Sequence, residues 1–190
     1  MELTSEDQRT ESGWALTRDL PREGKIAAAA ASGLLAVVCF IRFGLSGRAV
    51  VDAIFAATLV LLTAIDLDRR LIPNVIVLPA TALVLGLQIA LFPSRTLEWL
   101  LASLGAALFF FIPALIFPAG MGMGDVKLAA LLGAALGKSV LAAILVAVLS
   151  AAVVALVILA REGLGARRKA IAYGPFLAFG GVVVMLLGGR

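Results

Sequence analysis

The sequence contains no histidine and only one cysteine, and each of these shortages excludes a class of site. Without histidine, the chain cannot build a Ser-His-Asp or Cys-His catalytic arrangement, nor a His-Glu-x-x-His zinc site. Cys39 stands alone within an apolar segment, so it can form neither an internal disulfide nor a cysteine zinc cluster. Any catalysis must therefore depend on carboxylates, hydroxyls or lysine.

Charged residues are scarce as well, at 15% of the 190 residues, whereas hydrophobic residues make up 62%. A soluble domain is about 45–50% apolar, so this composition predicts an all-α, polytopic membrane helix bundle. No signal peptide is expected, because the first apolar run follows a long polar stretch rather than a short basic one. We expect residues 1–25 to form a polar cytoplasmic tail and residues 26–190 to form the transmembrane domain.

Seven apolar runs follow the polar tail, and each is long enough, or nearly so, to cross a bilayer as a helix. The fifth run is short, and Gly137-Lys138 separates it from the sixth, so the two could also form one broken helix. We predict about seven transmembrane helices, at residues 26–41, 50–65, 75–92, 97–117, 126–136, 139–160 and 171–187.

The lysines and arginines of the connecting segments predict how the bundle is oriented. With the N-terminus in the cytoplasm, most of these basic residues lie on the cytoplasmic side, and the segment Arg161–Lys169 contributes most clearly. In this orientation the second and fourth apolar runs both end at the cytoplasmic face. Residues that follow these two runs are therefore expected to lie near one another.

Acidic residues stand at both of these positions. Asp66 ends the second run and is followed by charged residues 68–70, which we expect in a loop. The fourth run leads into the glycine-rich segment Gly120–Lys127, in which Asp125 is expected to open the fifth helix. Glycine allows positive φ angles and close approach of another chain. The sequence therefore predicts that Asp66 and Asp125 meet at one membrane depth.

Two facing aspartates can activate water without histidine, cysteine or metal. Like charges a few ångströms apart cannot both ionise easily, so the pair shares one proton. One carboxylate then acts as a base on water while the other carboxyl donates a proton to the scissile carbonyl. This chemistry needs only the residue types that the sequence contains.

Each of these residues also has a purely structural explanation. Arg69, Arg70 and Lys127 can anchor helix ends at the membrane interface. An acid at a helix N-terminus, such as Asp125, is stabilised by the helix dipole. The glycine-rich segment and the shared depth of the two acids favour a functional site over these separate explanations.

The segment Gly122–Asp125 reads Gly-Met-Gly-Asp, which resembles the Gly-x-Gly-Asp motif of intramembrane aspartyl proteases. Asp66, followed by Pro73-Asn74, is similar to the other catalytic stretch of the type IV prepilin peptidases. Tyr173–Ala178 is similar to a segment in the last helices of the same family. The three matches occur in the family's order and cover the chain from about Val50 to Leu187.

The resemblance implies that Asp66 and Asp125 form the catalytic pair and that residues 26–190 are a peptidase domain. It implies a pilin-like precursor as substrate, whose short basic leader is cleaved just after a glycine at the cytoplasmic face of the inner membrane. The expected partners are therefore this precursor and the lipid bilayer, without nucleic acid. The residues expected to bind the substrate are Gly122, Gly124, Asp68 and Lys127.

The sequence departs from the larger members of the resembled family in one respect. Those members carry an N-terminal cytoplasmic region, commonly with two Cys-x-x-Cys pairs, and also methylate the new N-terminus. This chain has one cysteine and no such region. This departure puts methyl transfer in doubt, while we expect peptidase activity with no bound metal and no other cofactor.

Three other functions are compatible with parts of the pattern. An ion-coupled transporter could use Asp66 and Asp125 as a proton relay, although such relays usually lie near the membrane midplane. A magnesium-dependent transferase could use Asp66, Asp68 and Asp125 as ligands, although such a site usually has more carboxylates. An inactive assembly subunit could have kept the fold, but both aspartates are present.

Overall fold

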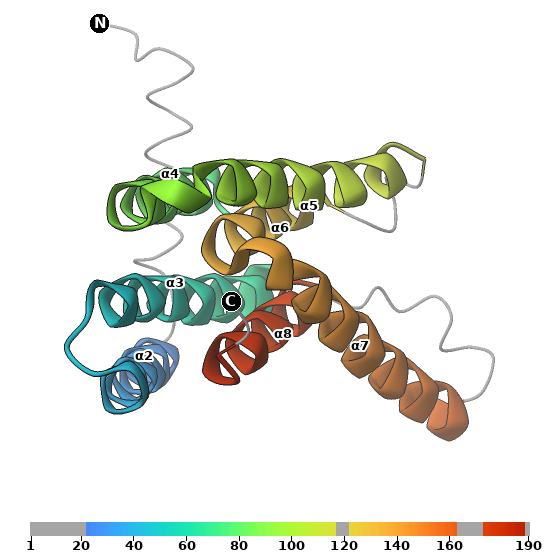
Figure 1. Ribbon diagram of the computed structural model, residues 1–190. Helices are drawn as coiled ribbons and strands as arrows, with labels where there is room; N and C mark the ends of the chain where they lie inside the picture. The colour runs from blue at the N-terminus through green and yellow to red at the C-terminus, as the bar shows by residue number, and fades with distance from the viewer. Residues whose placement is uncertain (1–21, 117–121, 163–172, 189–190) are drawn as a thin grey trace, which may run out of the picture.

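The computed structural model describes residues 22–116, 122–162 and 173–188, and within these ranges the chain is all-helical. Seven α-helices and two short 3-10 turns form the described part of the bundle (Figure 1). In chain order they are α2 (Arg22–Phe43), α3 (Gly47–Arg69), α4 (Asn74–Leu91), η1 (Pro93–Arg95), α5 (Thr96–Ile116), α6 (Met123–Leu136), η2 (Gly137–Ser139), α7 (Val140–Glu162) and α8 (Gly174–Leu186).

The predicted fold class is confirmed, and each predicted apolar run corresponds to one helix. Seven separate membrane crossings are not confirmed. Five helical segments of the described chain are long and apolar enough to cross a bilayer, and α6, η2 and α7 together make up one of them, Met123–Arg161. The last helix, α8, has only 13 residues.

Several helix boundaries differ from the predicted ones. α3 continues past Asp66 to Arg69, so residues 68 and 69 are helical rather than part of a loop. The backbone N–H of Arg70 still donates to the carbonyl of Asp66, at 2.8 Å, and Arg70 ends the helix in a left-handed conformation with φ 53°. At the other end of the chain, α2 begins at Arg22, inside the predicted tail, whose residues 1–21 lie outside the described ranges.

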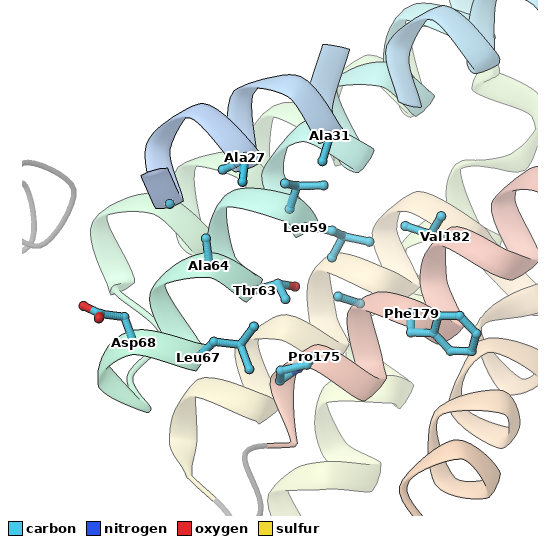
Figure 2. A pocket seen from close by; sticks show the side chains of 14 residues that line it. Ala27, Ala31, Leu59, Thr63, Ala64, Leu67, Asp68, Pro175, Phe179 and Val182 are labelled. Carbon is cyan, nitrogen blue, oxygen red and sulfur yellow. The ribbon is translucent and has the colours of Figure 1, made fainter. Parts of the chain in front are cut away.

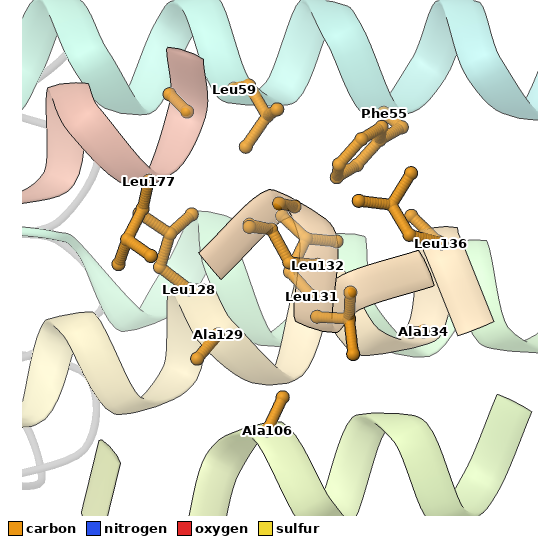
Figure 3. Packing of buried hydrophobic residues seen from close by; sticks show 14 of the residues in the cluster. Phe55, Leu59, Ala106, Leu128, Ala129, Leu131, Leu132, Ala134, Leu136 and Leu177 are labelled. Carbon is orange, nitrogen blue, oxygen red and sulfur yellow. The ribbon is translucent and has the colours of Figure 1, made fainter. Parts of the chain in front are cut away.

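α6 lies at the centre of the bundle and packs against α3, α4, α5 and α8. Its leucines fill the space between α3 and α8 on one side and α5 on the other (Figure 3). Small residues bring the backbones close together, as is common between membrane helices. A methyl group on Gly133 would overlap the backbone carbonyl of Ala102 in α5, and one on Gly180 would overlap that of Ala143 in α7.

Polar contacts fix the C-terminal half of α6. The buried amide of Gln88 in α4 donates from Nε2 to the carbonyl oxygen of Ala135, at 2.9 Å, and Ser103 in α5 donates from Oγ to that of Ala130, at 2.9 Å. Gly137 then turns the chain with φ +58°, which favours glycine. α6 and α7 are therefore two helices joined by a tight turn, and α6 is held to both of its neighbours.

Candidate functional site

Asp66 lies in the last turn of α3, and its side chain points into the bundle. The residue is 6% exposed, although charged residues flank it at the surface. Its Oδ2 atom is buried without a hydrogen bond of good geometry to any described residue.

The backbone of Gly174, the first residue of α8, covers this carboxyl. A Cβ atom built on Gly174 would stand 2.5 Å from Oδ2 and 3.0 Å from Cγ of Asp66. Only glycine therefore fits at this position without moving the carboxyl. α8 begins here because Pro175 at its start has the φ angle of a helix and needs no N–H donor in the first turn.

Asp125 is the third residue of α6, since the helix begins at Met123 rather than at Asp125 as the sequence predicted. Its Oδ2 accepts a hydrogen bond from the backbone N–H of Gly122, at 3.3 Å. The backbone N–H of Asp125 in turn donates to the carbonyl of Gly122, at 3.1 Å. The carboxyl thus satisfies a free donor at the start of the helix, which explains why the helix begins earlier.

The structure brings the two predicted acids together from α3 and α6. Asp66 and Asp125 are close enough to interact electrostatically. Tyr173, which precedes α8, lies near the same place: burial raises the pKa of its phenol, and the charge of Asp125 adds to this effect. The ends of α3, α6 and α8 therefore meet around one pair of carboxyl groups.

The glycines of the predicted motif leave room for neighbouring groups and do not adopt unusual backbone angles. Gly122 is exposed and extended, with φ −84°, and Gly124 lies within α6, so neither uses the positive φ that the sequence suggested. A Cβ on Gly124 would stand 2.9 Å from Cβ of Ile72, in the segment between α3 and α4. Gly124 therefore permits a close approach to Ile72, while Gly122 leaves open backbone beside Asp125. Gly120 lies outside the described residues.

The other two residues expected to bind substrate lie farther from the carboxyl pair. Lys127 donates from Nζ to Oδ1 of Asn74, the first residue of α4, at 2.6 Å. This contact ties α6 to α4 beside the site. Asp68 is exposed at the end of α3, with its Oδ2 3.3 Å from Nε of Arg69.

Four residues at the site were absent from the predicted set of site residues. These residues come from segments that are distant in sequence, so only the three-dimensional structure shows their contacts. The similarity of Pro73-Asn74 and Tyr173–Ala178 to family segments could have indicated three of them, but not Ile72. The four residues are Ile72, Asn74, Tyr173 and Gly174.

The donor set around the pair is poor in metal ligands. Within residues 22–116, 122–162 and 173–188, no three aspartate, glutamate, cysteine or histidine side chains are grouped so that they could hold a metal ion.

These features define a polytopic helical membrane protein with an acid pair at one end of its bundle. A sequence model described as the type IV leader peptidase family matches residues 53–160, a range that includes both acids. A prepilin leader peptidase/N-methyltransferase of Pseudomonas putida is 35% identical over an alignment of 162 residues that covers 82% of this chain. The chain therefore belongs to the type IV leader peptidase family.

The two proteins differ in length. The matched region covers 56% of the Pseudomonas putida protein, so the chain spans just over half of that relative. No solved structure matches the chain.

Proposed function

We propose that this protein is a membrane-embedded aspartic endopeptidase that removes the leader from type IV pilin-like precursors. The observation that carries the proposal is the meeting of Asp66 and Asp125, from α3 and α6, within electrostatic reach at one end of the bundle. Family membership supports the substrate class. A proton relay through the membrane finds no comparable support, since both acids lie near helix ends at the same side.

The proposed reaction uses the two carboxyls as a general acid and a general base. One carboxylate takes a proton from water while the new oxygen–carbon bond forms, and the other carboxyl gives its proton to the carbonyl oxygen. The tetrahedral intermediate then collapses and the carbon–nitrogen bond breaks. The departing amine takes the proton that the first carboxylate received from water, and the hydroxyl proton of the intermediate returns to the second carboxylate. Burial of Asp66 strengthens these interactions because little bulk water screens them.

The open backbone at Gly122 is suited to holding the substrate. A peptide bond must leave the helical conformation before water can attack it, because helical backbone groups are already paired. An extended segment could pair with the exposed backbone at Gly122, in the manner of strand addition. In this proposal the exposed carboxylate of Asp68 attracts the basic leader, and Lys127 orients the start of α6 through Asn74.

The proposal places the reaction at the cytoplasmic face of the inner membrane. The distribution of basic residues supports this orientation, because the Arg161–Lys169 segment and the C-terminal end of α3 then lie on the cytoplasmic side. The residues before α2 would form a cytoplasmic tail, and the chain from α2 onward would form the peptidase domain.

Co-expression with a pilin-like precursor tests the proposal, with leader removal followed as a gel shift. Asp66→Asn and Asp125→Asn should each lower the cleavage rate by roughly 10²–10⁴-fold or more, because each variant removes one partner of the acid–base pair. Asp68→Asn, matched in chemistry and two residues from Asp66, should retain most activity. Efficient cleavage by either of the first two variants would contradict the proposal, as would loss of cleavage on chelation and its recovery with Mg²⁺.

A further inference from the structure

An apolar groove of about 680 Å³ lies between α2, α3 and α8. α3 packs against both of the other helices and forms the floor of the groove. α2 forms one wall with small side chains such as Ala27 and Ala31, and α8 forms the other with Phe179 and Val182 (Figure 2). Only 6% of the most apolar stretch of α2 is buried against the rest of the structure, so this wall is open to an additional partner.

The shape of the groove fits a helix. Its lining runs along α3 from Leu59 to Asp68, which is about 14 Å along a helix axis, or between two and three turns. The small residues of α2 and the Ala64 side chain of α3 let another backbone approach closely, as in membrane helix pairs. Among the described residues that line it, Thr63 and Asp68 carry the only polar side-chain groups.

One end of the groove is lined by residues that directly follow those of the carboxyl site. Leu67 and Asp68, at one end of the lining, directly follow Asp66 in α3. Pro175, on the opposite wall, directly follows Gly174, whose backbone covers the Asp66 carboxyl. A helix seated in the groove would therefore have one end beside Asp66.

We propose that this groove binds an apolar membrane helix of the precursor substrate and thereby places the adjoining peptide bond at Asp66 and Asp125. The proposal rests on the proposed peptidase function and specifies how the substrate docks. Two features favour this occupant. One end of the groove is lined by the chain neighbours of Asp66 and Gly174. Its one charged lining residue is the exposed Asp68, whose carboxylate can exchange its contact with Arg69 for a basic leader that continues beyond the helix.

A matched pair of substitutions on α2 tests the proposal. Ala27→Phe fills the groove, whereas Ala29→Phe adds the same side chain at an exposed position outside its lining. Steady-state cleavage is measured with a membrane-anchored precursor and with a soluble peptide that contains only the leader and the cleavage site. We expect Ala27→Phe to raise KM for the precursor about tenfold, with little change in kcat, and to leave peptide cleavage unchanged.

The outcomes distinguish this inference from the proposed function. Equal KM values for the two variants would overturn the docking site while leaving the peptidase function intact. If the unmodified chain cleaved neither substrate, the peptidase function would be contradicted and the docking proposal with it.

A second measurement does not depend on cleavage. A photoreactive benzoylphenylalanine is introduced at position 27 or 29 in the Asp66→Asn background, and the membranes are irradiated with the precursor present. Cross-links to the precursor's apolar helix from position 27, but not from position 29, are expected. Cross-links from position 27 to lipid alone, or to a second copy of this chain, would overturn the proposal.

Discussion

The carboxyl group of Asp66 rests directly on the backbone of Gly174, so a Cβ atom at residue 174 would stand 2.5 Å from Oδ2. This contact joins α3 and α8 at the point where the proposed chemistry occurs. Because Asp66 is buried, its carboxyl cannot simply swing into solvent to make room. The position of the Asp66 carboxyl therefore depends on the lack of a side chain at Gly174, which lies more than a hundred residues away in the sequence.

Gly174→Ala should displace the Asp66 carboxyl and lower kcat by about tenfold or more, with little change in the folded bundle, because misplacing a reacting group is costly. The measurement is precursor cleavage together with the thermal stability of the purified protein. Gly105→Ala is the matched control, since a Cβ there meets nothing within 4 Å. A fully active Gly174→Ala protein would show that the contact does not position Asp66.

Gly122 and Gly124 should respond differently to the same substitution. A Cβ on Gly122 meets no described atom closer than 3.8 Å, so Gly122→Ala should fold normally, and any rise in KM reports a closer approach by substrate. A Cβ on Gly124 would press on Ile72, so Gly124→Ala should lower activity through a shift between α6 and the segment before α4. The double variant Gly124→Ala/Ile72→Ala should recover part of that loss. Failure to recover would mean that Gly124 acts through the substrate as well.

The hydrogen bond between Lys127 and Asn74 should contribute a measurable coupling between α6 and α4. Lys127→Met and Asn74→Ala should each lower stability modestly, and a double-mutant cycle should give a coupling of about 1 kcal/mol. If Lys127 acts only by positioning α6, the two single variants should also have the same effect on kcat. A larger loss in Lys127→Met than in Asn74→Ala would instead indicate direct contact with the substrate.

The pH dependence of kcat/KM should be bell-shaped, because the singly protonated pair is the active form. At low pH the carboxylate that acts as the base becomes protonated. At high pH the carboxyl that acts as the acid loses the proton that it must donate. The raised pKa of Tyr173 keeps its phenol protonated into the alkaline range, so Tyr173→Phe should leave both limbs of the profile in place. A shift of the alkaline limb in that variant would show that Tyr173 takes part in the proton transfer.

The sequence was sufficient to predict the helices and the meeting of the two acids, for identifiable reasons. Long apolar runs separated by polar residues leave few alternatives to membrane helices, and an N-terminus in the cytoplasm brings the ends of the second and fourth runs to one side. Helix ends were less accurate because hydropathy does not detect capping. Asp125 accepts from Gly122, and this bond starts α6 earlier than the apolar pattern indicates.

Contacts between distant segments could not be predicted in the same way. Nothing local in the sequence indicates that Gly174 lies on Asp66 or that Gly124 faces Ile72, because both contacts arise from helix packing. The groove between α2, α3 and α8 is likewise a property of three helices together. Its alanines, read along the sequence, are ordinary residues of membrane helices.

The lengths of α6 and α8 have a consequence for water. They have 14 and 13 residues, so each extends about 20 Å, whereas the hydrocarbon core of a bilayer is about 30 Å thick. The two helices are neighbours, and both begin at the carboxyl pair. Gln88 in α4 and Ser103 in α5 hold the far half of α6 to these longer helices. We therefore expect the length that α6 lacks to be missing on the side of the acids. We accordingly expect the helical wall to be thinner than the surrounding lipid at this point, so that water reaches the carboxyl pair without a pore through the membrane.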